Sequence, residues 1–273
     1  VSPQAFVTGG VLRGASAQQE VISLPRTFAP GPGSGLDVEL SPSLAGSLLS
    51  GLEAMEVPLY AVSAEASLSY LLPNIEVHRA LNNAGLSDPA LSERVATNLN
   101  AGVSRLQSLQ NTDGGWSWWG QSEQSDPYVS AYVLFGLSRA QKVSEAVSRE
   151  TLDRAAAYLQ GTQPTVTADT SGSDLDEAVF IQFALSQAGS TDPDRADALY
   201  AARDRMSPAS RALLASIVNA VNPADPRVRE LVNNLETDAI RTASSAHWET
   251  PPQNLLRRGS PVYTTSVVVY VLA

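Results

Sequence analysis

The apolar residues of this chain recur with a period of about 3.6 from Ser41 to Ala273, and this period limits the possible folds more than any other feature. Positions three and four residues apart form apolar stripes, which predict amphipathic helices. Ser or Asp precedes most of the stripes and Gly or Pro follows them, as expected at helix starts and stops. The sequence therefore predicts an all-α domain of roughly ten helices joined by short loops.

The expected helices differ in polarity, and this difference indicates how they pack. Nearly apolar, Ala-rich helices alternate with more polar ones such as residues 227–241. Two concentric layers, with inner helices buried on all sides and outer helices amphipathic, explain this alternation and predict an (α/α)6 toroid. The expected helices cover approximately residues 41–55, 68–84, 87–109, 126–143, 148–159, 174–188, 192–205, 207–221, 225–242 and 260–273.

Both ends of the chain indicate a piece of a longer protein. Because a complete toroid has about twelve helices, we expect about two to be missing beyond Ala273 and an apolar seam along residues 260–273. Residues 1–40 contain short β-type runs broken by Gly-rich and Pro-rich segments. Since a β-sandwich needs far more strand than this, we interpret residues 1–40 as a β-strand remnant with a linker, and residues 41–273 as the helical domain.

Composition excludes several classes of function. The net charge of −10 and a pI near 4.7 argue against nucleic-acid binding, which needs a basic surface. The absence of Cys excludes disulfides, thiolate metal sites and a Cys nucleophile. The longest apolar run, residues 267–273, is too short to span a bilayer, so no direct membrane insertion is expected.

Residues 58–73 have the pattern of a reactive site in which the reacting side chains are replaced. They read Pro-Leu-Tyr-Ala-Val-Ser-Ala-Glu-Ala-Ser-Leu-Ser-Tyr-Leu-Leu-Pro, a loop leading into an apolar helix. This stretch resembles Pro-Tyr-Gly-Cys-Val-Glu-Gln-Thr-x-Ser-x-Leu-Leu-Pro of bacterial alpha-2-macroglobulins, in which the Cys and Gln side chains form an internal thioester. In this alignment the Cys, variable, Glu and Gln positions hold Ser63, Ala64, Glu65 and Ala66.

In this alignment, both the nucleophile and the acyl group that a thioester needs are missing. A thiolate must attack the carboxamide carbon three residues further on, but Ser63 has no thiol and Ala66 has no acyl group. The Ser63 hydroxyl could substitute for the thiol by forming an ester, but no group substitutes for the missing acyl carbon. We therefore expect no internal acyl bond, and we interpret Ser63 as a helix N-cap.

A second resemblance lies in Asp113-Gly114-Gly115-Trp116, a turn that recurs in alpha-2-macroglobulin thioester domains and, more loosely, in terpenoid cyclases of the same architecture. The two glycines permit a tight turn with positive φ. Trp116, Trp118 and Trp119 are expected to pin the loop against helix ends, a structural role that we favour over an aromatic ligand cage. A third and weaker resemblance lies in residues 263–267, which are similar to the Thr-Thr-x-x-Ala start of a late inner helix in the same family.

The resemblance covers roughly residues 37–273 and implies a function. It implies a fragment of a bacterial protease inhibitor, following strands of a CUB-like sandwich, that acts as a steric, noncovalent trap and not as an enzyme. The implied partners are the trapped proteases and neighbouring domains of the same chain, without a cofactor. The implied location is the periplasm or the extracellular space, with a role in host defence.

An enzyme of toroidal fold is the alternative interpretation. The acidic residues Asp169, Asp174, Asp176 and Glu177 loosely resemble the proton donor of a terpenoid cyclase, and a polysaccharide-active hydrolase would also need carboxylates. Helix capping explains these acids more simply. The two interpretations differ in whether residues 174–177 line a central cavity. The isolated residues His78 and His247 give no metal-site signal.

Overall fold

The structure, a computed structural model, describes residues 63–84, 89–120, 124–242, 245–250 and 260–273. The chain divides into two units, residues 1–42 and 43–273, and every described residue belongs to the second. The strands predicted in residues 1–40 and the helix predicted at residues 41–55 lie outside the described residues. They stay predictions.

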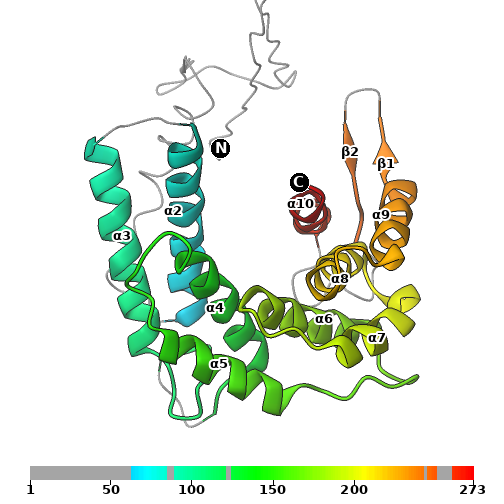
Figure 1. The fold of residues 1–273 in the computed structure, drawn as a ribbon, viewed down its shortest axis with the longest axis horizontal. Coiled ribbons are helices and arrows are strands. Elements are labelled where there is room, and N and C mark those ends of the chain that lie inside the picture. The colour runs from blue at the N-terminus through cyan, green and yellow to red at the C-terminus, as the bar shows by residue number, and fades with distance from the viewer. Residues whose placement is uncertain (1–62, 85–88, 121–123, 243–244, 251–259) are drawn as a thin grey trace, which may run out of the picture. The chain divides into compact units, whose positions relative to one another are not determined.

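Helices make up most of the described residues (Figure 1), and the prediction of an all-α fold is confirmed. Their bounds agree with the predicted ranges to within a few residues at most ends. In chain order the helices are α2 (Ala64–Ala84), α3 (Pro89–Ser108), α4 (Pro127–Ala140), α5 (Arg149–Thr162), α6 (Gly172–Gln187), α7 (Pro193–Ala201), the 3-10 helix η1 (Arg203–Arg205), α8 (Pro208–Val221), α9 (Pro226–Asp238) and α10 (Pro261–Leu272).

The helices alternate between two layers along the chain. Helices α2, α4, α6, α8 and α10 pack against one another in that order and form the inner layer. Each of α3, α5 and α7 packs against the two even-numbered helices next to it in sequence, and α9 packs against α8. This succession of inner and outer helices is that of an α/α toroid, so the predicted architecture is confirmed.

Burial explains why the inner helices are more apolar than the outer ones. In α4, every residue from Val129 to Ala140 except Tyr132 and Phe135 is buried. In α9, by contrast, only Leu231 and Leu235 are buried. A helix with neighbours on several sides needs apolar residues all round, whereas one with a solvent-facing side needs a single stripe.

Helix α2 approaches its neighbours closely because two glycines face it. A Cβ atom at Gly136 of α4 would overlap the buried Leu68 side chain of α2. A Cβ atom at Gly102 of α3 would lie 3.0 Å from Cδ1 of Leu71. These contacts fix how α2, which follows Ser63 directly, sits between α3 and α4.

Two predicted helices are wrong at their C-terminal ends. The helix expected over residues 225–242 stops at Asp238, and Ile240–Arg241 (β1) pairs antiparallel with Ala246–His247 (β2). Ile240 and Thr242 are β-branched and favour extended backbone. The helix expected over residues 192–205 stops at Ala201 and tightens into η1, as final turns often do.

Helix α10 has one buried and one exposed side. Val268 and Thr264 are buried, and Val267 and Val271 pack against the core, whereas Val262, Val269 and Leu272 are exposed. The predicted apolar seam is therefore narrower than expected, because Val267, Val268 and Val271 face inward.

Candidate functional site: the start of α2 and the Trp116 turn

Ser63 lies directly before the first residue of α2 and caps the helix. Its Oγ accepts a hydrogen bond from the Ala66 N–H at 3.0 Å, which satisfies one of the free donors of the first turn. The Ser63 carbonyl accepts from the Ser67 N–H at 3.1 Å and from the Ser67 Oγ at 2.9 Å. The Ser63 hydroxyl is thus engaged with the backbone of Ala66.

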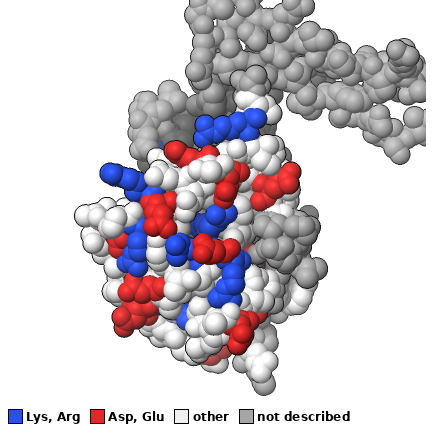
Figure 2. Space-filling view, turned by 90° about the vertical axis from the view of Figure 1, so that its right-hand side faces the viewer, with Lys and Arg blue, Asp and Glu red and all other residues white. Residues whose placement is uncertain are grey.

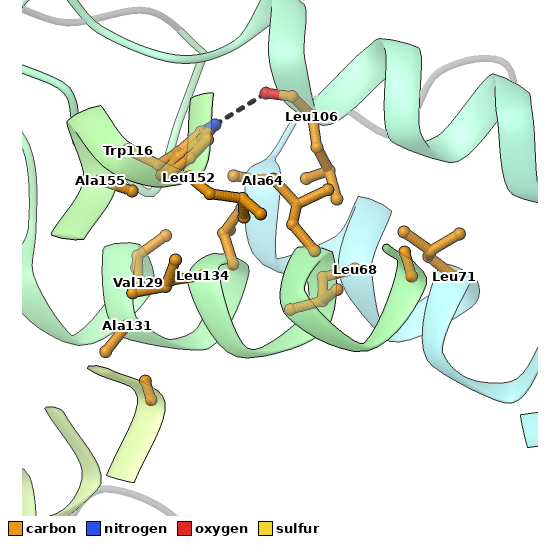
Figure 3. Packing of buried hydrophobic residues seen from close by; sticks show 14 of the residues in the cluster. Ala64, Leu68, Leu71, Leu106, Trp116, Val129, Ala131, Leu134, Leu152 and Ala155 are labelled. Atoms are coloured by element: carbon orange, nitrogen blue, oxygen red, sulfur yellow. Dashed lines mark hydrogen bonds between the residues drawn. The ribbon is translucent and has the colours of Figure 1, made fainter. Parts of the chain in front are cut away.

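The side chains after Ser63 divide between the core and the surface. Ala64 is buried in the same apolar cluster as Leu68, Leu106 and Trp116 (Figure 3). Glu65 is half-buried and accepts a hydrogen bond from the Ser69 hydroxyl at 3.3 Å. The structure therefore places two sequence motifs about fifty residues apart in one cluster.

The backbone of the Trp116 turn needs both glycines. Gly114 has φ +95°, and a Cβ atom there would lie 2.5 Å from the carbonyl oxygen of Arg154. A Cβ atom on Gly115 would lie 2.5 Å from Cβ of Ser125. The Asp113 carboxylate closes the turn by accepting from the Gly115 N–H at 3.0 Å and from the Ser125 hydroxyl at 2.6 Å.

Trp116 anchors this turn in the core. Its side chain is fully buried, and its indole Nε1 donates to the carbonyl oxygen of Leu106 in α3 at 2.8 Å (Figure 3). Its backbone N–H donates to the Ser130 Oγ in α4 at 2.8 Å. Through its side chain and its backbone, one residue thus joins the end of an outer helix to the start of the next inner helix.

The expectation that three tryptophans pin the loop is wrong for Trp119. Its side chain is 77% exposed, and that of Trp118 is 41% exposed. Trp118 donates from Nε1 to an Asp126 carboxylate oxygen at 3.0 Å. Sequence composition does not distinguish the three indoles, because only the path of the chain after Gly115 decides which of them faces the core.

Two groups around the turn, Asp113 and Tyr158, have shifted pKa values. Burial raises the pKa of Asp113, but the hydrogen bonds from Ser125 and Gly115 outweigh this and leave the pKa below its ordinary value. Burial, followed by the nearby charges of Asp113 and Asp126, raises the pKa of Tyr158 to about 12. Since the Tyr158 hydroxyl donates to the Ser125 carbonyl at 2.8 Å, it acts as a neutral donor at neutral pH.

A second tryptophan, which the sequence analysis did not single out, repeats the arrangement of Trp116. Trp248 is buried and donates from Nε1 to the carbonyl oxygen of Leu235 in α9 at 2.7 Å. Its N–H donates to the Thr265 Oγ1 in α10 at 3.0 Å, as that of Trp116 does to Ser130. In both cases the Trp precedes a helix that starts with Asp-Pro or Ser-Pro and has a hydroxyl side chain in its first turns. This sequence pattern could have predicted the role of Trp248.

The acidic residues near the start of α6 have structural roles. Asp174 accepts from the hydroxyl of Ser171, the N-cap of α6, at 2.8 Å. Asp176 accepts from the backbone N–H of Ser207, the N-cap of α8, at 3.1 Å. Asp169 and Asp174 are exposed. These contacts are capping interactions, which favour carboxylates at helix starts.

The histidines lie apart. His78 is in α2 and His247 is in β2, where it pairs with Ile240. In the described part of the chain, no group of three or more His, Asp or Glu side chains could hold a metal ion. Among the same residues, no helix is both long enough and apolar enough to cross a membrane.

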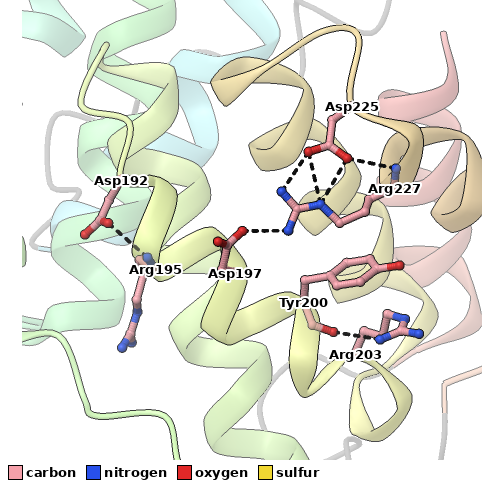
Figure 4. Close-up of polar contacts among 7 residues, drawn as sticks. All are labelled: Asp192, Arg195, Asp197, Tyr200, Arg203, Asp225 and Arg227. Atoms are coloured by element: carbon pink, nitrogen blue, oxygen red, sulfur yellow. Dashed lines mark hydrogen bonds and ion pairs between the residues drawn. The ribbon is translucent and has the colours of Figure 1, made fainter.

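Positive charge is neutralised locally where the outer helices α7 and α9 meet. Arg227 pairs with Asp225 at 2.7 Å and with Asp197 at 2.6 Å, and it lies over the Tyr200 ring together with Arg203 (Figure 4). Figure 2 shows acidic and basic side chains interleaved on the face turned to the viewer. Paired charges of this kind form no continuous basic surface.

The succession of inner and outer helices defines this domain as an α/α toroid. Residues 50–173 match the family described as the A-macroglobulin TED domain. The resemblance to the alpha-2-macroglobulin family seen in the sequence is confirmed by this match.

Individual alpha-2-macroglobulins are also similar to the chain. The chain is 25% identical over 227 residues to an alpha-2-macroglobulin homolog of Nostoc sp., a match that covers 80% of this chain and 12% of the relative. The crystal structure of a Salmonella alpha-2-macroglobulin mutant is similar at a TM-score of 0.63, with 18% identity, over 82% of this chain and 14% of that one. Trypsin-activated alpha-2-macroglobulin from Escherichia coli is similar at a TM-score of 0.59, with 17% identity, over 77% of this chain and 14% of that one. The chain thus spans a small part of its relatives.

Proposed function

We propose that this chain is the thioester-type domain of an alpha-2-macroglobulin-like protease inhibitor that works without a thioester, as a steric and noncovalent trap. The observation that carries the proposal is the hydrogen bond from the Ala66 N–H to the Ser63 Oγ. It gives the serine a capping role at the position where the family has its reactive thiol. The methyl group of Ala66 supplies no acyl carbon.

The proposed partners are proteases that cleave a bait region elsewhere in the parent chain. Support comes from relatives, since solved Escherichia coli alpha-2-macroglobulins are described as activated by trypsin and by porcine elastase. Neighbouring domains of the parent, including a CUB-like sandwich continuing from residues 1–40, are the second class of proposed partner. We place the parent in the periplasm or outside the cell, in a protective role.

The alternative, a toroidal enzyme, has less support. It requires the carboxylates of residues 174–177 to face a substrate, whereas Asp174 and Asp176 accept hydrogen bonds from the N-cap residues of α6 and α8. A terpenoid cyclase or a polysaccharide-active hydrolase would need a free carboxyl group for proton transfer. Capping leaves Asp174 and Asp176 poorly suited to that role.

The test uses the parent protein and a protease that cleaves its bait region. After cleavage, we expect the protease to lose activity toward large substrates and to keep activity toward small peptide substrates. Denaturing electrophoresis should show no adduct, and prior treatment with a small amine should change nothing. Mass spectrometry of the peptide that contains residues 63–66 identifies any covalent product.

Two outcomes separate the parts of the proposal. A denaturant-stable adduct through residues 63–66 would refute noncovalent capture. Unchanged turnover of both large and small substrates would refute the trap. Ser63→Ala in the parent serves as the control, because it removes the hydroxyl without changing the proposed mechanism and should trap as the unmodified parent does.

A further inference from the structure

Trp118 and Trp119 are two consecutive exposed tryptophans, a pair that the proposed function does not use. Trp119 is 77% exposed, which is unusual for the largest apolar side chain. Trp116, two residues before Trp118, is buried, and Asp126 caps α4 by accepting from the Val129 N–H at 2.9 Å. Trp118 is oriented further by its hydrogen bond to Asp126. The two indoles therefore directly follow the anchored end of the Trp116 turn, and one of them is held by a hydrogen bond.

Negative charge accompanies these indoles. The Asp126 carboxylate accepts a hydrogen bond from Trp118 Nε1 at 3.0 Å, and the Asp113 carboxylate accepts one at 2.6 Å from the hydroxyl of Ser125, the residue before Asp126. Besides burial, both carboxylates raise the pKa of Tyr158, whose hydroxyl donates to the Ser125 carbonyl at 2.8 Å. Asp113 is exposed, and its lowered pKa keeps it ionised at neutral pH.

Few basic side chains lie near the two tryptophans, and the one that reaches the turn, Arg154, is hydrogen-bonded to backbone carbonyl oxygens. The sequence contains no Lys or Arg between Arg105 and Arg139. Arg154 reaches the turn from α5, but its Nη2 donates to the carbonyl oxygens of Asn111 and Thr112 at 2.8 and 3.1 Å. The surface thus combines π-faces with carboxylates and has a net negative charge.

We propose that Trp118 and Trp119, with Asp113 and Asp126, form a docking surface for an arginine-bearing segment of a partner protein. A guanidinium stacks on an indole through cation–π attraction and is drawn to the neighbouring carboxylates. Trp and Arg are also the residues that most often dominate protein–protein interfaces. The proposal does not depend on the trap mechanism, since it concerns only this surface.

The test uses the full chain labelled with 15N at its four tryptophans, whose indole N–H signals are followed by NMR. The probe is a blocked peptide Gly-Arg-Leu-Arg-Gly, and the same peptide with citrulline in place of arginine tests for the charge. We expect saturable shifts of the Trp118 and Trp119 signals with the arginine peptide only. The signals of the buried Trp116 and Trp248 should not move.

Variants assign the effect to the surface. Trp119→Ala should weaken binding of the arginine peptide roughly threefold to tenfold, and Asp113→Asn should weaken it less. The matched control is Val262→Ala on α10, which truncates a side chain that is also 77% exposed and should leave binding unchanged. Far-UV circular dichroism establishes that each variant is folded.

Three results would overturn the proposal. Equal binding of the citrulline peptide would show that the positive charge is not recognised. Equal binding to Trp119→Ala would place the contact elsewhere. Shifts of the Trp119 signal with a neutral oligosaccharide such as cellohexaose, and none with the arginine peptide, would mean that the indoles bind a glycan instead.

Discussion

Replacing Trp116 by Phe tests the account of how the turn holds the inner and outer layers together. The substitution keeps an aromatic ring but removes the indole N–H that donates to the Leu106 carbonyl at 2.8 Å. A buried carbonyl that loses its donor costs about 1–3 kcal/mol. Because the Leu109 N–H also donates to this oxygen, at 3.2 Å, we expect a loss of about 1 kcal/mol from the hydrogen bond.

The smaller ring adds a second loss. Trp116 is fully buried, so its removed ring atoms leave a space that costs about 1–2 kcal/mol. The free energy of unfolding should therefore fall by about 2–3 kcal/mol. For a domain of this size, that corresponds to a decrease in Tm of about 4–10 °C.

The assay is urea denaturation of the unmodified protein and of Trp116→Phe, monitored by far-UV circular dichroism. The free energies of unfolding are compared using the same dependence on urea concentration for both proteins. Trp119→Phe is the matched control, because the same chemical change at a side chain that is 77% exposed should alter stability by less than about 0.5 kcal/mol. A Trp116→Phe variant as stable as this control would refute the reasoning. Trp248→Phe, which removes the equivalent bond to Leu235, should behave like Trp116→Phe.

Three further predictions concern the same region and are measured by denaturation. Gly114→Ala should destabilise the protein more than Gly120→Ala, because both have positive φ but only a Cβ on Gly114 meets a backbone oxygen; equal losses would contradict the close approach to Arg154. Ser63→Ala should cost about 0.5–2 kcal/mol, whereas Ser63→Asp should retain the cap; an unaffected Ser63→Ala would argue against capping by this hydroxyl. The folded-state pKa of Asp113 is lowered, so its contribution is present above the unfolded pKa of about 3.9 and is lost as the pH falls through the folded value. Asp113→Asn should consequently be less stable at pH 7 and show a shallower acid limb, and identical pH profiles would exclude this linkage.

Local pattern was sufficient where the determining interactions are local. The starts of α8 and α10 follow from Ser207-Pro208 and Ser260-Pro261, whose hydroxyls accept from the N–H groups of Ser210 and Tyr263. A capping side chain acts within three residues of its own position, so sequence alone identifies it. The end of α9 was missed because Ile240 pairs with His247, a contact that no helical period encodes.

For the candidate site, the sequence by itself determined what chemistry is absent, since it depends only on residue identity that Ser63 carries no thiol and Ala66 no acyl group. It also determined the order of the helices and the need for glycine in the turn. Tertiary structure alone decided that Ala64 shares a core cluster with Trp116, that Trp119 faces solvent, and that Trp248 repeats the Trp116 arrangement. The reason is physical. Residue identity sets which bonds are possible, whereas burial and hydrogen bonding between distant segments depend on how the layers pack.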